Sequence, residues 1–519
     1  MHLAINPFDM KRTYWLVVLG LMLLVSPRVS AATEAQMRLH FVGANAVQNH
    51  REALVLRDIA KIAEGAPVFQ LITRQLAGKW SAGLGIAPSP ATNQLAGAIA
   101  EILRAEIHFE LTSPNTAAWR LAARLPEDKA KSVQTTLQDF ARAAKAVVEA
   151  KVDATGSWRF TPLKTKQATH VSYQRGWLVI DSTGDPQPSN WRQRLMQHGK
   201  LSLPTGPIGA LSVKSALLKT WVPRLQNGTP FDVSLVTKVR KGTLRTEGSI
   251  DFQHPVKPDL EPFQLPTNTL RDPMISFTAA RGISGLLARQ PELRQWRLPK
   301  YPNQLIAWTE SDRPVYTTMA MPLKGADGWF KKQIPRFEES LGLIVESKGM
   351  GTIKYMTNYH AAVWRGLPLI APYVSPNPRD PDWLFAASFP GFLPKGAITN
   401  APPEQLLSQI RNRDDLIYYH WEVTEPRVQQ LQLISSLAGV LMMKRMPLAG
   451  NPMPVWIKAM QDRLGNTITE LTRASDRQWR FVRSSSVGLT AAELAVLGQL
   501  LTPSKPMAGM PLPPGLNRK

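Results

Sequence analysis

The same order of local elements is predicted at two places that lie far apart in the chain. Residues 110–121 read ELTSPNTAAWRL, and residues 470–481 read ELTRASDRQWRF. In each place an alternating apolar stretch, a polar turn and a second alternating stretch predict a β-hairpin. A helix with an apolar stripe is predicted after each hairpin. Hairpins followed by packing helices favour an α+β fold.

The two predicted helices begin with recognisable signals. Pro126, Glu127 and Asp128 place acidic side chains in a first helical turn, where the helix dipole favours them. After the second hairpin, Thr490 and Glu493 have the spacing of a capping box. We interpret the two regions as copies of a unit of roughly two hundred residues. The predicted fold class is therefore α+β, with duplicated units of antiparallel β-sheet and helices packed on one face.

The tryptophan and arginine of each motif are expected to point in opposite directions. Neighbouring side chains alternate between the faces of a strand, so Trp119 and Arg120 cannot share one face, nor can Trp479 and Arg480. We expect each Trp to anchor a core. A looser third instance of the order spans residues 305–341, where Pro335 should kink or delay the helix.

The N-terminus predicts export. Lys11 and Arg12 precede an apolar run at residues 15–25, and small residues lead to Ala31. The run is shorter than the roughly 20 residues that a membrane-spanning helix needs. We predict a cleaved signal peptide at residues 1–31, no transmembrane span after cleavage, and a periplasmic or extracellular protein. A retained anchor is the alternative.

Proline-rich stretches mark the predicted domain boundaries. We expect a first α+β domain at residues 32–252, a linker at 253–265 and a second α+β domain at 266–502. A C-terminal subunit at 413–502 is expected within the second domain. Residues 503–519 predict a disordered, Pro-rich tail.

Composition limits the chemistry and the partners. The chain contains no cysteine, so a disulfide framework, a thiolate metal site and a cysteine nucleophile are excluded. The formal net charge of +23 favours anionic partners. For an exported protein these are an anionic envelope polymer or an acidic protein rather than nucleic acid.

Catalytic signatures are absent from the sequence. No phosphate-binding loop, dinucleotide-binding motif, zinc-binding HExxH or GxSxG nucleophile elbow occurs. The histidines are scattered singly, so no metal site and no cofactor are predicted.

The best catalytic candidates are His420 and Glu422, which alternation places on one face of a predicted strand at residues 416–425. A structural role on a half-buried strand is the competing interpretation. Asp380 and Asp382 are a second candidate pair, either as carboxylates or as calcium ligands. Ordinary turn chemistry also explains them.

One predicted helix concentrates positive charge and is the candidate polyanion-binding patch, with Pro291 interrupting it. Its basic residues are Arg281, Arg289, Arg294, Arg297 and Lys300.

Three functional hypotheses follow. The first is an exported, non-enzymatic envelope protein that acts as a scaffold or binding module and presents a basic surface. The second is a hydrolase of envelope material with a site between the two halves. The third is an assembly protein whose tail docks a partner. The sequence does not decide the enzyme question or the oligomeric state, but the missing signatures favour the first hypothesis.

Overall fold

The computed structural model describes most of the chain beyond the N-terminal region. The described residues are 35–83, 89–112, 118–144, 147–149, 157–161, 168–182, 207–222, 228–270, 272–294, 296–310, 316–347, 349–367, 370–377, 380–388, 403–441 and 452–500. The predicted signal peptide and the predicted tail lie outside these ranges.

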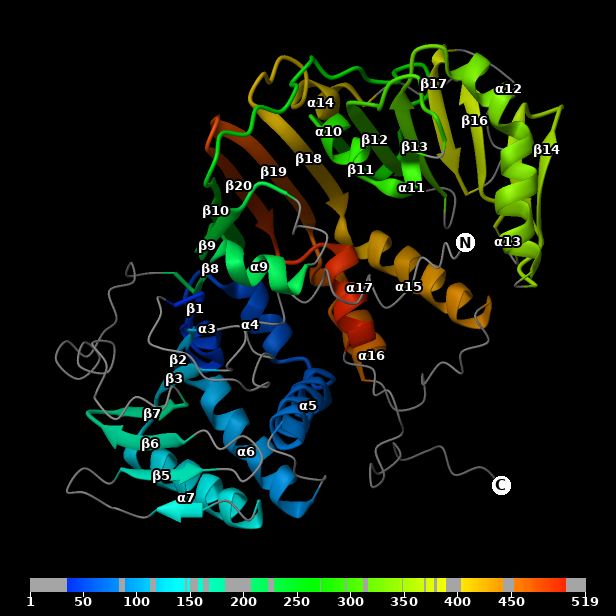
Figure 1. The fold of residues 1–519 in the computed structure, drawn as a ribbon. Helices are drawn as coiled ribbons and strands as arrows, with labels where there is room; N and C mark the ends of the chain where they lie inside the picture. Colours follow the sequence, from blue (N-terminus) through cyan, green and yellow to red (C-terminus); the bar gives the residue numbers. More distant parts are fainter. Residues whose placement is uncertain are drawn as a thin grey trace.

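A single antiparallel sheet runs through the molecule as an arch (Figure 1). Every strand pairing among the described residues is antiparallel, which confirms the predicted α+β class with an antiparallel sheet. From one edge to the other the strands are β14 (Thr352–Met356), β15 (Ala361–Arg365), β16 (Tyr373–Asn377), β17 (Asp380–Ala387), β13 (Thr317–Pro322), β12 (Gln304–Glu310), β11 (Met274–Arg281), β18 (Leu416–Val423), β19 (Asn466–Ser475), β20 (Gln478–Ser485), β10 (Thr243–Phe252), β9 (Phe231–Arg240), β8 (Gly209–Val213), β1 (Met37–Phe41), β2 (Glu106–Leu111), β3 (Trp119–Arg124), β7 (Trp177–Asp181), β6 (Thr169–Gln174), β5 (Trp158–Thr161) and β4 (Val147–Glu149).

Helices pack on both faces of this sheet. They are α3 (Ala44–Asn49), α4 (Leu54–Ala60), α5 (Gly65–Gly83), α6 (Pro90–Arg104), α7 (Glu127–Ala143), α9 (Ser215–Trp221), α10 (Ser284–Ala288), α11 (Pro291–Arg294), α12 (Ala326–Arg336), α13 (Gly342–Ser347), α14 (Glu404–Ser408), α15 (Thr424–Leu441), α16 (Met453–Ala459) and α17 (Ala491–Leu500), with a π-helical turn η2 (Phe337–Leu341) and a 3-10 turn η4 (Gln461–Arg463). None of the described helices is long and apolar enough to span a membrane.

The inner face of the sheet, on which α15, α16 and α17 lie, carries the largest core (Figure 1). Leu71 of α5, Leu95 of α6 and Leu137 of α7 belong to the same apolar cluster as Ile457 of α16 and Leu494 of α17. On the opposite, outer face, Leu407 of α14 is buried in a cluster with Phe277 and Tyr419. The expectation that helices cover one face therefore holds only for part of the sheet.

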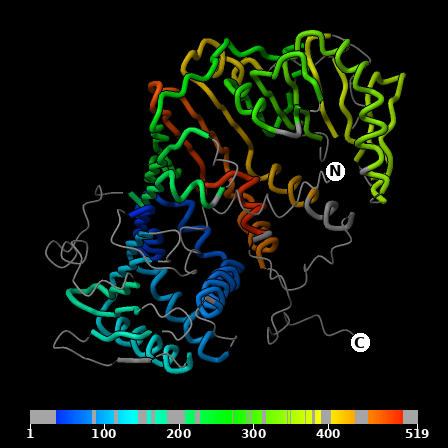
Figure 2. Tube along the Cα trace, in the orientation of Figure 1, coloured from blue at the N-terminus to red at the C-terminus, as the bar shows by residue number. Residues whose placement is uncertain are grey.

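The two predicted halves are joined within the sheet. Strand β10 precedes residues 253–265, yet it pairs with β20 from the C-terminal region over eight residue pairs, from Leu244 opposite Ser485 to Asp251 opposite Gln478. Figure 2 shows these C-terminal strands beside strands from the middle of the chain. The predicted division at residues 253–265 thus falls inside one continuous sheet.

Both predicted hairpins are present, as β2–β3 followed by α7 and as β19–β20 followed by α17. Their registers differ by two residues, because Glu110 is opposite Arg120 whereas Thr472 is opposite Arg480. Trp119 is buried in the inner core, and Trp479 is half-buried with its ring 4.8 Å from that of Phe252. Both hairpins are present in the structure, whereas duplication of an α+β unit stays a prediction.

Arg281 does not belong to an exposed basic patch, contrary to the prediction. Its residue is only 1% exposed, and its guanidinium donates hydrogen bonds to the carbonyl oxygens of Leu416, Leu260, Glu261 and Arg413. Burial lowers the pKa of this guanidinium, which nevertheless stays charged because an arginine does not lose its proton in proteins. The side chain fastens part of the predicted linker, residues 260 and 261, to the chain that enters β18.

We expect Arg281→Met to lower the free energy of unfolding by about 3 kcal/mol, because it leaves several buried carbonyl groups without a donor. Arg289→Met removes an exposed arginine nearby and should change stability by less than about 0.5 kcal/mol. Urea titration of both variants measures the difference. Equal stability of the two variants would contradict the stabilising role of the hydrogen bonds that Arg281 donates.

Candidate functional site

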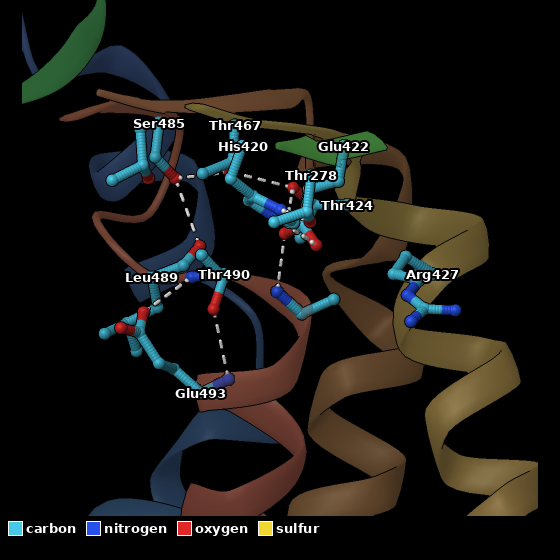
Figure 3. Close-up of polar contacts among 12 residues, drawn as sticks. Thr278, His420, Glu422, Thr424, Arg427, Thr467, Ser485, Leu489, Thr490 and Glu493 are labelled. Carbon is cyan, nitrogen blue, oxygen red and sulfur yellow. Dashed lines mark hydrogen bonds and ion pairs between the residues drawn. The ribbon is translucent and has the colours of Figure 1, made fainter. Parts of the chain in front are cut away.

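His420 and Glu422 lie on the inner face of β18, as strand alternation predicts (Figure 3). His420 Nε2 is 3.2 Å from Glu422 Oε2, and His420 Nδ1 is 2.8 Å from Thr278 Oγ1 on the neighbouring strand β11. Thr278 and His420 are direct cross-strand partners, which explains why the hydroxyl meets the ring. The hydroxyl, imidazole and carboxylate therefore form one connected chain.

The Glu422 carboxylate accepts a hydrogen bond from the start of α17. Its residue is 1% exposed, and Oε1 accepts a 2.6 Å hydrogen bond from the backbone amide of Ala491, the first residue of that helix. Thr490 and Glu493 form the predicted capping box, since each side chain bonds to the other's backbone amide. A buried carboxylate at a helix N-terminus is stabilised by the unpaired amides and by the helix dipole.

Further hydroxyl groups complete this network (Figure 3). Thr424 Oγ1 donates to Glu422 Oε1 and lies 2.8 Å from Thr467 Oγ1, which in turn donates to Ser485 Oγ. Ser485 Oγ then donates to the carbonyl oxygen of Leu489, just before α17. The network ties β18, β19, β20 and α17 together, so His420 and Glu422 have a structural role in the fold.

Of the second candidate carboxylate pair, Asp380 and Asp382, the structure describes only the side chain of Asp382. Asp382 Oδ1 accepts a hydrogen bond from the backbone amide of Gly325, immediately before α12. The side chain of Asp380 lies outside the described residues. Asp382 lies in β17 and its partner is 57 residues away in the chain, rather than in its own turn as the turn interpretation expects.

The remaining basic candidates, Arg289, Arg294, Arg297 and Lys300, are exposed. The predicted interruption at Pro291 is present, because α10 ends at Ala288 and α11 begins at Pro291. Lys300 Nζ lies 3.6 Å from Glu261. Polyanion binding by these four residues stays a prediction.

A charged cavity of about 340 Å³ lies on the outer face over β10, β19 and β20. Arg245, Arg413 and Arg480 line it. Arg413 is within 3.7 Å of both Asp415 and Glu470, and Arg245 bonds to Glu247. Because acidic neighbours already neutralise much of its positive charge, this cavity is a poor anion-binding site.

A second cavity, of about 350 Å³, is lined mainly by apolar side chains and lies beside the inner face of the other end of the sheet. Its volume is within the range of small-molecule sites. The lining residues are Thr317, Met319, Phe337, Leu341, Ile353, Ala362, Trp364, Pro372, Tyr373, Val374, Ala386, Ala387 and Ser388.

The sequence around Pro335 shapes the wall of this apolar cavity. Proline has no amide hydrogen to donate, so it removes one hydrogen bond from α12. The helix then widens into the single π-helical turn η2. Two residues of that turn, Phe337 and Leu341, line the cavity. Pro335 does not delay the helix, which begins at Ala326, and the irregular turn that follows Pro335 lies at a cavity wall.

Arg427, on the first turns of α15, brings a positive charge to the edge of the apolar cavity. Its Nη1 donates to Thr317 Oγ1 at 3.2 Å and to Gln430 Oε1 at 3.0 Å. No ion pair joins Arg427 to any residue in the part of the chain that the structure describes. Burial lowers the pKa of its guanidinium and the negative charge of Glu422 opposes this, so the group remains charged.

One row of cross-strand neighbours connects the histidine to the cavity. His420 is opposite Thr278, Thr278 is opposite Ala307, Ala307 is opposite Met319, and Met319 is opposite Ala386. Directly paired residues share a face, so the polar network and the apolar cavity occupy one surface. His420 itself does not line either of the two cavities described above.

Sequence analysis did not identify the apolar cavity or Arg427. The cavity walls come from β13 to β17, α12 and η2, whose order in space does not follow their order in the chain. The available signal was the charged residue Arg427, which directly precedes a stretch rich in apolar residues from 428 to 441. Its meaning depends on Thr317, which is 110 residues away.

Comparisons with known proteins add little. No family model and no curated protein matches this chain. One solved structure, crystal form I of TP0453, is similar at a TM-score of 0.23, with 13% identity over 46% of this chain and 79% of that chain. A similarity of this size supports no conclusion about fold or function.

We expect Glu422→Gln to lower the free energy of unfolding by about 1–2 kcal/mol, because the charge at the start of α17 is lost. Glu404→Gln is the matched control, since Glu404 lies in the first turn of α14 with its side chain 61% exposed. Thermal unfolding measures both. A Glu422→Gln protein as stable as the control would exclude the structural role of this carboxylate.

Proposed function

We propose that this protein is an exported, non-enzymatic binding protein that holds an anionic amphiphile in the apolar cavity beside η2. The observation that carries the proposal is the position of Arg427, whose guanidinium reaches Thr317 at the cavity edge without an acidic partner among the described residues. Glu422 acts on this partly buried cation without forming an ion pair with it, so an anionic ligand at the cavity edge would relieve more of the cost of its burial.

The cavity matches the other part of such a ligand. Phe337, Leu341 and Trp364 provide apolar surface, while the short side chains of Ala362 and Ala386 leave room between the sheet and η2. Burial of a hydrocarbon chain there contributes roughly 0.8 kcal/mol for each methylene removed from water. Met319 is 42% exposed and marks an accessible rim.

The cellular setting belongs to the same proposal. The predicted signal peptide supports a periplasmic or extracellular location, where anionic lipids and polymers of the envelope occur. The net charge of +23 would draw the protein toward such surfaces through long-range attraction. The exposed Arg289, Arg294, Arg297 and Lys300 are candidates for that weaker contact, with an envelope polymer or an acidic protein.

The hydrolase hypothesis has one observation in its favour, the hydroxyl, imidazole and carboxylate chain of Thr278, His420 and Glu422. The order resembles that of a nucleophile, a base and an orienting acid. Against it, the Glu422 carboxylate is already bound to the amide of Ala491, and His420 lines neither described cavity. We therefore place binding ahead of catalysis.

The duplication of an α+β unit also remains our proposal. It is supported by the shared order of strand, turn, strand and helix at β2–β3–α7 and β19–β20–α17. The differing strand registers require a shift of two residues in one copy.

We expect dodecanoate to bind the full chain and Arg427→Gln to weaken that binding about tenfold, equivalent to about 1.4 kcal/mol, because a charge-assisted hydrogen bond is lost. Dodecan-1-ol, which has the same chain without the charge, should bind the two proteins equally. Isothermal titration calorimetry measures both ligands.

A second variant tests the apolar part of the site. Met319→Glu should weaken dodecanoate binding by at least about tenfold, because a carboxylate at the rim repels the anionic ligand and draws water into the apolar cavity. Leu286→Glu changes an exposed leucine on α10 and is the matched control. Failure of dodecanoate to bind, or equal binding by both variants, would overturn the proposed site.

A further inference from the structure

Three side chains with metal-binding atoms converge on the outer face of the sheet, far along the chain from the apolar cavity. His40 comes from β1, and Glu106 and His108 come from β2. One ligand atom from each lies within 4.8 Å of those of the other two. His40 Nε2 is 3.2 Å and His108 Nε2 is 3.6 Å from the same oxygen, Glu106 Oε1.

Strand pairing produces this convergence. His40 and His108 are direct partners in the antiparallel β1–β2 ladder, and Glu106 is two residues before His108 on the same face. The next strands place small residues beside the rings, with Ala210 opposite His40 and Ala122 opposite His108.

The two rings are held rigidly away from solvent. His40 is 6% exposed and His108 is 4% exposed, and their ring centroids are 4.5 Å apart in a stacked arrangement. The ring of Trp177 packs against His108 at 5.4 Å. Because the ligand side chains are already ordered, metal binding costs less conformational entropy. The Glu106 side chain is 30% exposed, so the site retains a path to solvent.

The Glu106 carboxylate presents one oxygen, Oε1, to both rings. Arg124 lies 3.7 Å from the other oxygen, Oε2, which leaves Oε1 facing the two rings.

We propose that His40, Glu106 and His108 form a binding site for a divalent transition-metal cation, with Zn²⁺ as the best match. Two imidazole nitrogens and one carboxylate oxygen are a ligand set that zinc uses, with the fourth position left to water or another ligand. A single dication between the three atoms satisfies all of them.

Titration of the full chain with ZnCl₂ by isothermal calorimetry tests the proposal. We expect about one equivalent of Zn²⁺ to bind. Glu106→Gln and His108→Gln should each weaken this binding at least about tenfold, since each removes one of three ligands. Glu110→Gln, on the same face of β2, and His254→Gln, at an exposed position, should bind Zn²⁺ like the unmodified protein.

A second measurement needs no variant and remains decisive if a substitution at a buried histidine prevents folding. In protein labelled with ¹³C-histidine, Zn²⁺ should shift the ring signals of His40 and His108 and leave that of His254 in place. Absence of Zn²⁺ binding, Glu106→Gln binding as tight as the unmodified protein, or a shift confined to other histidines would each overturn the proposal.

Discussion

The pairing of β10 with β20 is the contact on which the rest of the architecture depends. It joins a strand from the middle of the chain to the C-terminal hairpin through a continuous backbone ladder. Without it the sheet would end at two unpaired edges, and exposed edges invite association. With it, α16 and α17 reach the helices of the first 150 residues, and one core forms on the inner face.

Polar residues of this sheet take their roles from the face they occupy and from the strand beside them. Arg281 was expected to bind polyanions, but its neighbours are backbone carbonyls and the ring of Phe263, 4.6 Å away. Glu422 was a catalytic candidate, but its nearest donor is the first amide of α17. In both cases a charge is buried because the fold supplies several fixed partners for it.

Local patterns predicted local structure well. The hairpins, the helix that begins at Glu127, and the capping box of Thr490 and Glu493 all follow from spacing and turn chemistry. The His420 and Glu422 pair was also predictable, because residues two apart on a strand share a face. Whether that pair acts in catalysis or in holding the fold together was not predictable. The hydrogen-bond partners of the two residues, Thr278 and Ala491, lie 142 and 69 residues away in the chain.

The sequence by itself determined the elements, the absence of cysteine chemistry and the strong positive charge, because these depend on residues close together in the chain or on composition alone. Only the tertiary structure decided which strands are neighbours. That choice placed Arg427 beside Thr317 at an apolar cavity and His40 beside Glu106 and His108. The physical reason is that long-range strand order is set by the total burial of both sheet faces, which no single segment encodes.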